Sequence, residues 1–133
     1  MANAIYPKYK EAILQSAANS SLAAGVVKVA LVDTATYTYS AAHEFQTSLT
    51  GVIGTPATLA SKTMVNGAFD SADPTMTAVS GATGEAIVIF IDTGSTATSR
   101  LVAFLDTGFT GLPVTPSGSD ITIAVNASGW FTL

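Results

Sequence analysis

Ala86-Ile87-Val88-Ile89-Phe90-Ile91 and, after a polar loop, Leu101-Val102-Ala103-Phe104-Leu105 are the two stretches of sequence that decide the fold. Each has the length of a strand and is rich in β-branched or aromatic residues. A strand of an antiparallel sheet normally alternates, because one face packs on the core and the other meets water. These two stretches are apolar at every position. We therefore expect both faces to be covered, either by an N-terminal helix or by another subunit.

Short strand-like segments recur on both sides of these stretches, joined by loops rich in Gly and Thr. Asn66-Gly67 is a strong signal for a two-residue hairpin turn between two of them. Long helical patterns do not alternate with the strands, which argues against a parallel α/β sheet. The sequence predicts an all-β fold: an antiparallel, jelly-roll-like β-sandwich of about eight strands.

One segment near the start has a helical pattern. Residues 6–18 place Pro7 at a plausible first helical position, and Tyr9, Ile13 and Ala17 then share one face at intervals of four residues. We therefore divide the chain into a short N-terminal helix or arm, residues 1–20, and a single β-sandwich domain, residues 21–133. The pattern fits a helix that lies on its own sheet, and it also fits an arm that docks on a neighbour.

The composition is unusual in its charge. Charged residues make up 11% of the 133 residues, whereas a typical soluble domain has about 25%. The net charge is −4 with only five Lys and Arg, so the chain cannot build the basic stripe that binds phosphate backbones, and we expect no nucleic-acid partner. No apolar run approaches the roughly 20 residues of a membrane helix, so we expect no membrane partner either. Such a composition suits a surface that is partly covered by partner proteins.

Two Asp-Thr-Gly triplets, Asp92-Thr93-Gly94 and Asp106-Thr107-Gly108, resemble the active-site motif of aspartic proteases. Those enzymes need two carboxylates that share one proton. In a hairpin these two Asp residues would stand about 20 Å apart, since six residues of strand separate them at about 3.3 Å each. A dyad formed across a homodimer from one triplet remains compatible with the spacing. We favour a structural interpretation, in which Asp92 pairs with Arg100 across the hairpin, and expect no enzyme.

The remaining candidate residues give weaker patterns. His43 is the single histidine, and no nucleophile is marked out beside it, so we interpret it as a surface or turn residue. Asp70-Ser71-Ala72-Asp73 offers the oxygen ligands that calcium prefers, but the twelve-residue calcium loop is absent, and we interpret it as a turn. The chain also lacks cysteine. We predict no catalytic residue, no metal site and no cofactor.

Further motifs are spread over nearly the whole chain. They are Asn3-x-x-Tyr6-x-x-Tyr9-Lys10-x-x-Ile13-Leu14, Val27-Lys28-Val29-Ala30-Leu31-Val32-Asp33, Leu59-Ala60-Ser61-Lys62-Thr63, Ala68-Phe69-Asp70-Ser71-Ala72-Asp73, Ile91-Asp92-Thr93-Gly94 and Ile123-Ala124-Val125-Asn126-Ala127-Ser128-Gly129-Trp130-Phe131-Thr132-Leu133. Together they resemble the small structural proteins of tailed bacteriophages.

This resemblance implies a virion component made in the cytoplasm of a bacterial host. We expect a capsid cement or decoration protein, a homo-oligomer (dimer or trimer) that binds the outer surface of the major capsid protein shell. The alternative is a neck, tail or fibre-associated virion protein, such as a receptor-binding module. The expected interface combines the helix with one face of the apolar strands, and its residues are Tyr6, Lys8, Tyr9, Ile13, Leu14, Ile89 and Phe104.

Overall fold

The two apolar stretches form the centre of the molecule. In the computed structural model, which describes residues 3–133, they are β7 (Ala86–Asp92) and β8 (Arg100–Leu105). They are neighbours in a five-stranded antiparallel sheet of order β1-β8-β7-β2-β3, which we call the central sheet. Its other strands are β1 (Ala4–Ile5), β2 (Val26–Val32) and β3 (Val52–Thr58).

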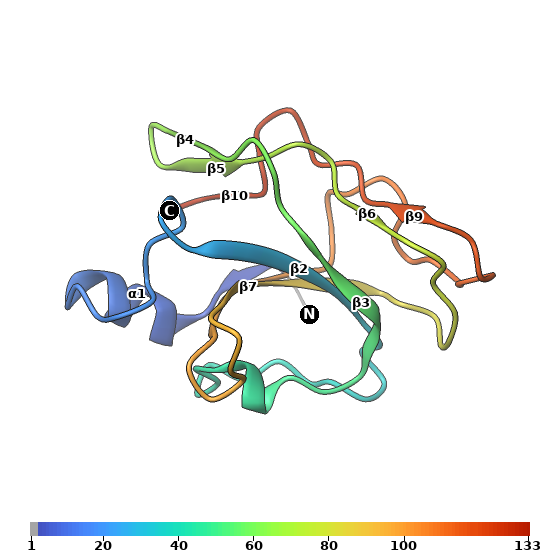
Figure 1. Cartoon of the computed structure of the whole chain (residues 1–133), viewed down its shortest axis with the longest axis horizontal. Coiled ribbons are helices and arrows are strands. Elements are labelled where there is room, and N and C mark those ends of the chain that lie inside the picture. Colours follow the sequence, from blue (N-terminus) through green and yellow to red (C-terminus); the bar gives the residue numbers. More distant parts are fainter. Residues whose placement is uncertain (1–2) are drawn as a thin grey trace.

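Two smaller antiparallel sheets lie above the central sheet in Figure 1. One has the order β10-β5-β4 and the other pairs β6 with β9; their bounds are β4 (Thr63–Val65), β5 (Ala68–Asp70), β6 (Thr75–Met76), β9 (Ile121–Thr122) and β10 (Phe131–Thr132). The predicted hairpin turn is confirmed, because Asn66 and Gly67 join β4 to β5 with φ angles of 52° and 82°.

The all-β antiparallel fold is thus confirmed, in a sandwich-like arrangement. The described residues contain ten strands, in sheets of five, three and two. A jelly roll has eight strands in two sheets, so that finer topology is not confirmed. The observed topology differs from a jelly roll because several of the expected strands are only two or three residues long. The chain continues beyond each of them as irregular loop.

One face of the central sheet packs against the small sheets, and we call it the strand-covered face. Successive residues of a strand point to opposite faces, so Ile87 and Ile89 of β7 share this face with Val29 and Leu31, their partners in β2. All four side chains are fully buried. Buried residues of the upper layer complete this part of the core: Leu59, Phe69, Met76, Ile121, Ile123 and Trp130.

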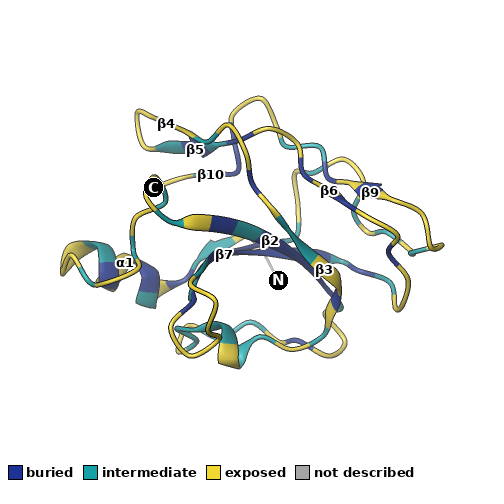
Figure 2. Cartoon of the chain, viewed as in Figure 1, coloured by how far each residue is buried: buried dark blue, intermediate teal, exposed yellow. Residues whose placement is uncertain are grey.

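The opposite face is covered by the irregular segment 33–51, and we call it the loop-covered face (Figure 1). The segment contains one 3₁₀ turn, η1 (Gln46–Ser48). The rings of Tyr37 and Tyr39 pack on Phe104 of β8, with ring centroids 6.2 and 5.7 Å apart. The chain therefore covers both faces of its apolar strands by itself, as the dark strands of Figure 2 show. The expectation of a second subunit as the cover is corrected, and the N-terminal segment supplies only part of the cover, through the contact of Tyr6 with Tyr37 and Tyr39.

The N-terminal segment belongs to the same body. Helix α1 (Pro7–Leu14) begins at Pro7 as predicted, but it ends at Leu14, because Ser16 has a left-handed φ of 51°. Before it, β1 pairs with β8, and Tyr6 and Tyr9 are buried in the hydrophobic core. Of the two readings of this segment, the structure shows the helix that lies on its own sheet.

Candidate functional site

The structure divides the seven expected interface residues into two groups. Tyr6, Tyr9, Ile89 and Phe104 are at most 3% exposed, so they are core residues of the chain itself and cannot also touch a partner. That part of the expected interface is wrong, because a pattern of apolar residues does not tell an intramolecular cover from an intermolecular one. The other three, Lys8, Ile13 and Leu14, lie on the outer side of α1.

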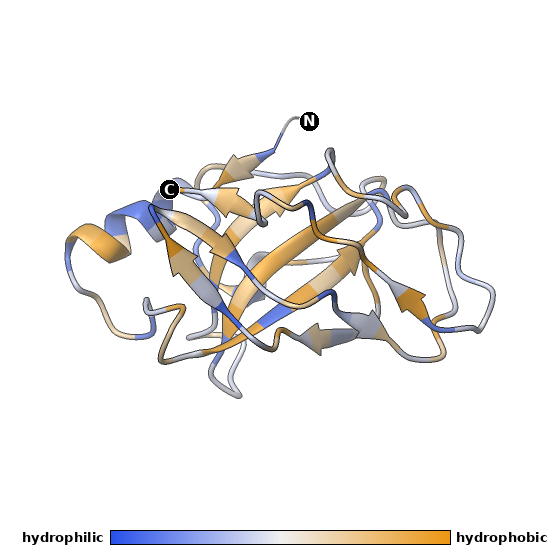
Figure 3. Cartoon of the chain, turned by 90° about the horizontal axis from the view of Figure 1, so that it is seen from above, coloured by the Kyte–Doolittle hydropathy of each residue, from blue (hydrophilic) through white to orange (hydrophobic). Residues whose placement is uncertain are grey.

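Of the six exposed large apolar side chains among residues 3–133, four lie at one extremity of the molecule, and the other two, Val26 and Val52, are on β2 and β3. Leu14 is 86% exposed, Val65 63%, Leu133 58% and Met64 44%. Leu133 and Leu14 line a shallow hollow of about 330 Å³ together with Lys10 and Ile13. The backbone N–H of Leu133 donates to the carbonyl of Gly67, which places the chain terminus beside the β4–β5 turn. We call this surface, formed by Ile13, Leu14, Met64, Val65 and Leu133, the apolar end; Figure 3 shows the hydrophobic tip of α1 that belongs to it.

A buried row of hydrogen bonds supports the loop-covered face. The hydroxyl of Tyr6 lies 2.7 Å from the hydroxyl of Tyr37, which in turn lies 2.8 Å from Nδ1 of His43. Every group has a partner if Tyr6 donates to Tyr37 and Tyr37 donates to Nδ1, which puts the histidine proton on Nε2. Burial raises the pKa of both tyrosines, so both hydroxyls stay protonated. His43 follows a turn, as expected, but its half-buried ring has this additional role of holding Tyr37.

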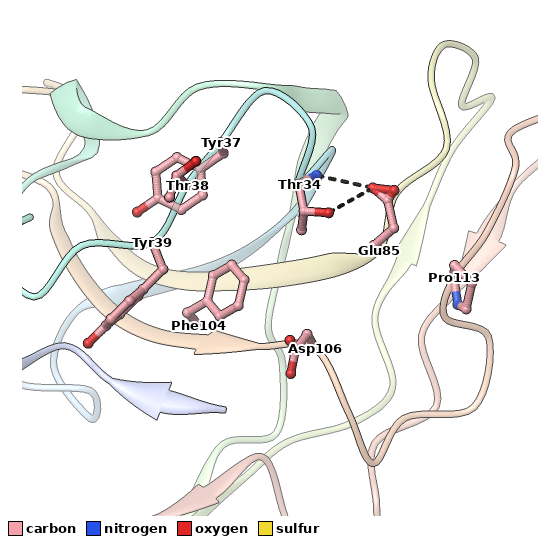
Figure 4. A pocket seen from close by; sticks show the side chains of 8 residues that line it. All are labelled: Thr34, Tyr37, Thr38, Tyr39, Glu85, Phe104, Asp106 and Pro113. Carbon is pink, nitrogen blue, oxygen red and sulfur yellow. Dashed lines mark hydrogen bonds between the residues drawn. The ribbon is translucent and has the colours of Figure 1, made fainter. Parts of the chain in front are cut away.

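A hollow of about 520 Å³ opens beside these tyrosines (Figure 4). We call it the aromatic cavity, and its lining residues are Thr34, Tyr37, Thr38, Tyr39, Glu85, Phe104, Asp106 and Pro113. Its two carboxylates come from neighbouring strands, since Glu85 directly precedes β7 and Asp106 directly follows β8. The Oε1 atom of Glu85 accepts hydrogen bonds from the backbone N–H of Thr34 at 3.0 Å and from its hydroxyl at 3.3 Å.

The sequence patterns did not point to this cavity. Tyr37-Thr38-Tyr39 alternates like a short strand, and Glu85 reads as the polar start of an apolar one. The sequence contains one indication of the cavity, namely the two aromatic residues Tyr37 and Tyr39 in an otherwise polar segment. Only the fold shows that this segment crosses the ends of β7 and β8.

The Asp-Thr-Gly triplets are turns in the structure. Gly94 and Gly108 both have a φ of 86°, a conformation that suits glycine. The Asp92 carboxylate accepts from the Gly94 N–H, while the backbone N–H groups of Asp106 and Thr107 donate to Oδ1 of Asn3. Ile87 pairs with Leu105, so Asp92 and Asp106 stand at opposite ends of the hairpin, roughly 20 Å apart at about 3.3 Å per residue. They do not form a dyad within one chain.

The expected ion pair between Asp92 and Arg100 is wrong. Asp92 instead binds the ammonium group of Lys28 on β2 at 2.8 Å, and this contact, with the N–H of Gly94, lowers the pKa of Asp92. Arg100 turns the other way, to Glu44 at 3.1 Å and to the ring of Phe45, 5.0 Å from its centroid. Both side chains find their partners in segments far away in the sequence, which a hairpin argument does not consider.

The Asp70–Asp73 segment ties loops together. Asp70 accepts from the backbone N–H of Ser71, and Asp73 accepts from that of Val125. Within residues 3–133, no three His, Asp or Glu side chains are grouped in a way that could hold a metal ion. In the same residues, no helix combines the length and the apolar character that a membrane crossing requires.

No protein-family model matches the chain, and no curated protein sequence matches it.

Proposed function

We propose that the protein is a structural component of a virion: a capsid cement or decoration protein that binds the outer surface of the major capsid protein shell. The observation that carries the proposal is the apolar end, because four exposed large apolar side chains at one extremity favour contact with another protein. The resemblance of the sequence motifs to phage structural proteins supports the same role.

The contact would work by burial of apolar surface. A fully buried leucine contributes about 1.5–3 kcal/mol relative to an exposed one, so Leu14 and Leu133 alone supply a useful part of a specific contact. The ion pair between Lys8 and Glu11, at 3.2 Å, lies on the same helix and would form part of a polar rim. Small gains of this kind, repeated over many copies, stiffen a shell made of identical subunits.

The proposal includes self-association as a dimer or trimer. The low charge of the chain supports it, because few charged groups would lose their hydration at a contact between copies. The mass measured by light scattering over a range of protein concentrations tests this part separately from shell binding.

The test of shell binding uses the double variant Leu14→Ser/Leu133→Ser. We expect it to lose at least about tenfold in affinity for purified capsids that lack the protein, measured by co-sedimentation, because two apolar contacts disappear. Val52→Thr is the matched control, since Val52 is exposed on β3 and is not part of the apolar end. Equal binding by the double variant would show that the apolar end is not the contact.

The location of the wild-type chain in the virion, seen by cryo-electron microscopy, tests the role itself. Density over the whole shell supports the cement role. Density at the portal vertex, the tail or the fibres alone would replace it with the alternative, a neck, tail or fibre-associated protein such as a receptor-binding module.

A further inference from the structure

Two edge strands from different sheets line one hollow of the molecule. β1 is the last strand at one side of the central sheet, and β10 is the last strand of the β10-β5-β4 sheet. The hollow between them has a volume of about 520 Å³ and is lined by residues 3–5 and 130–132 together with Lys10 and Leu105. We call it the edge groove, and we propose that it binds an extended segment of a partner protein as an added strand beside β1. The inference goes beyond the shell contact proposed above and does not need a capsid.

The backbone of β1 presents a donor and an acceptor on its outer side. The N–H of Tyr6 donates to the carbonyl of Val102 at 3.0 Å. Hydrogen-bonded and non-hydrogen-bonded pairs alternate along an antiparallel ladder, so Ile5 and Ala103 form a non-hydrogen-bonded pair. The N–H and the carbonyl of Ile5 therefore point away from β8, and no hydrogen bond within residues 3–133 takes up either group. A segment added beside β1 gains one hydrogen bond in each direction.

The backbone of β10 presents the same pair of groups on its own outer side. The N–H of Leu133 donates to the carbonyl of Gly67, one step along the register from the pair of Thr132 with Ala68. The N–H and the carbonyl of Thr132 therefore point away from β5. Strand edges with unpaired backbone groups are templates for a further strand. An extended peptide carries its donors and acceptors at strand spacing, which a sugar or a lipid does not.

The side chains beside β1 decide the chemistry of the added segment. Ile5 shares the strand-covered face with Ile89, two strands away. The residue of the added segment that pairs with Ile5 points to the same face, where the partly exposed ring of Phe131 also lines the groove. An apolar, β-branched side chain suits this place. Leu105 and Trp130 are at most 3% exposed, so the contact does not rely on them.

Lys10 adds a requirement for negative charge. It is exposed and is the one ionisable side chain among the eight lining residues. Within the part of the chain that the structure describes, its ammonium group forms no ion pair, whereas Lys8 on the same helix is paired with Glu11. Residues two positions apart in a strand share a face, so a carboxylate two positions from the apolar side chain would bind Lys10 from within the groove. Lys10 also lines the hollow of the apolar end, so the two surfaces adjoin.

The experiment is a titration of the ¹⁵N-labelled full-length chain with the peptide acetyl-Glu-Thr-Val-Thr-Glu-amide, followed by NMR. The central valine can pair with Ile5 in either chain direction, because a glutamate stands two positions away on each side. We expect chemical-shift changes at residues 3–5, Lys10 and 131–132, and slower hydrogen exchange of the Ile5 amide. The peptide acetyl-Glu-Thr-Ser-Thr-Glu-amide, which lacks the apolar side chain, should bind at least about fivefold more weakly.

Methylation of the valine nitrogen in the peptide is the sharpest test of strand pairing. It removes the N–H that would donate to the carbonyl of Ile5 and leaves every side chain in place, so we expect at least about a fivefold loss of affinity. The N–H of a neighbouring threonine points away from β1, because successive residues of a strand alternate. Methylation of that nitrogen is the matched control and should change the affinity less.

Lys10→Gln tests the charge in the groove. We expect about a two- to fivefold loss of affinity for the peptide, the range of an exposed ion pair. Lys8→Gln removes the same charge from the same helix at a position that does not line the groove. It should bind as the wild type does in about 0.15 M salt, which screens distant charges.

Three results would overturn the inference: shift changes that map elsewhere, equal binding of the peptide methylated at valine, or unchanged binding by Lys10→Gln. The wild-type chain is also diluted without any peptide. If protein concentration alone shifts the signals of residues 3–5 and 131–132, the occupant of the groove is a second copy of the chain and the inference is wrong. None of these results depends on whether the protein binds a capsid.

Discussion

The two faces of the central sheet are covered in different ways. The strand-covered face meets two small sheets of short strands, and its side chains at the centre are aliphatic: Val29, Leu31, Ile87 and Ile89. The loop-covered face meets an irregular segment and carries aromatic rings, tyrosine hydroxyls and a histidine. The same pair of strands, β7 and β8, contributes to both.

The difference follows from how backbone groups are satisfied. Strands pair their backbone groups with each other, so the small sheets can present a closed apolar surface to the sheet below. An irregular segment must use side chains and turns for this purpose, and it packs less regularly. The aromatic cavity lies on the loop-covered face, as does Phe104. We therefore expect the strand-covered face to contribute more to stability than the loop-covered face, which carries the aromatic cavity.

Ile89→Ala tests the strand-covered face and should have the largest effect. Ile89 is fully buried between β2 and β8, so its truncation leaves a cavity, and the free energy of unfolding should fall by about 2–5 kcal/mol. Urea denaturation measures it. Val52→Ala, at an exposed position of β3, is the control and should change little. A loss under about 1 kcal/mol at Ile89 would mean that this face is not the main source of stability.

Tyr37→Phe tests the loop-covered face and should have an intermediate effect. The change keeps the ring but removes the hydroxyl between Tyr6 and His43, so the fully buried Tyr6 hydroxyl loses its partner. We expect a loss of about 1–3 kcal/mol in the free energy of unfolding, again by urea denaturation. Tyr39→Phe is the matched control, because within residues 3–133 the hydrogen-bonded row joins Tyr6, Tyr37 and His43 and does not include the Tyr39 hydroxyl. Equal losses in the two variants would contradict the role of the hydrogen-bonded row.

The sequence alone predicts the parts of this contrast that depend on local patterns. Apolar residues on both faces of 86–91 require a cover on both faces, and Asn66-Gly67 requires a tight turn, wherever the rest of the chain lies. The identity of the cover depends on topology. Tyr37 and Tyr39 stand in a polar segment without periodicity, and only tertiary contacts bring them onto Phe104.

The candidate sites also depend on tertiary contacts that local sequence patterns do not predict. Leu14 was part of the expected interface and is exposed, whereas Tyr6 and Tyr9 share its helical pattern and are buried. A short helix with apolar residues on more than one side does not reveal which side meets the core. The aromatic cavity combines residues from four separate parts of the chain, so no local motif could predict it.

Asp92→Asn gives the smallest effect and tests whether the loop-covered face also depends on charge. Lys28 lies opposite Phe90 in the sheet register and so points to this face, where it binds Asp92 at the rim. The folded state lowers the pKa of Asp92 below its ordinary value of 3.8. Its carboxylate therefore contributes stability in full above that value and loses the contribution as the pH falls through the lowered pKa.

We expect Asp92→Asn to reduce the free energy of unfolding by up to about 1 kcal/mol near neutral pH, a small effect because the pair is partly exposed. The difference from the wild type should shrink when the pH falls below 3.8, as urea denaturation at several pH values would show. Lys28→Gln alone and together with Asp92→Asn completes a double-mutant cycle, which isolates the energy of the pair. A difference that stays constant down to low pH would mean that the charge of Asp92 does not cause the loss, because the wild-type carboxyl group is also neutral there. The stability of the loop-covered face would then not depend on this charge.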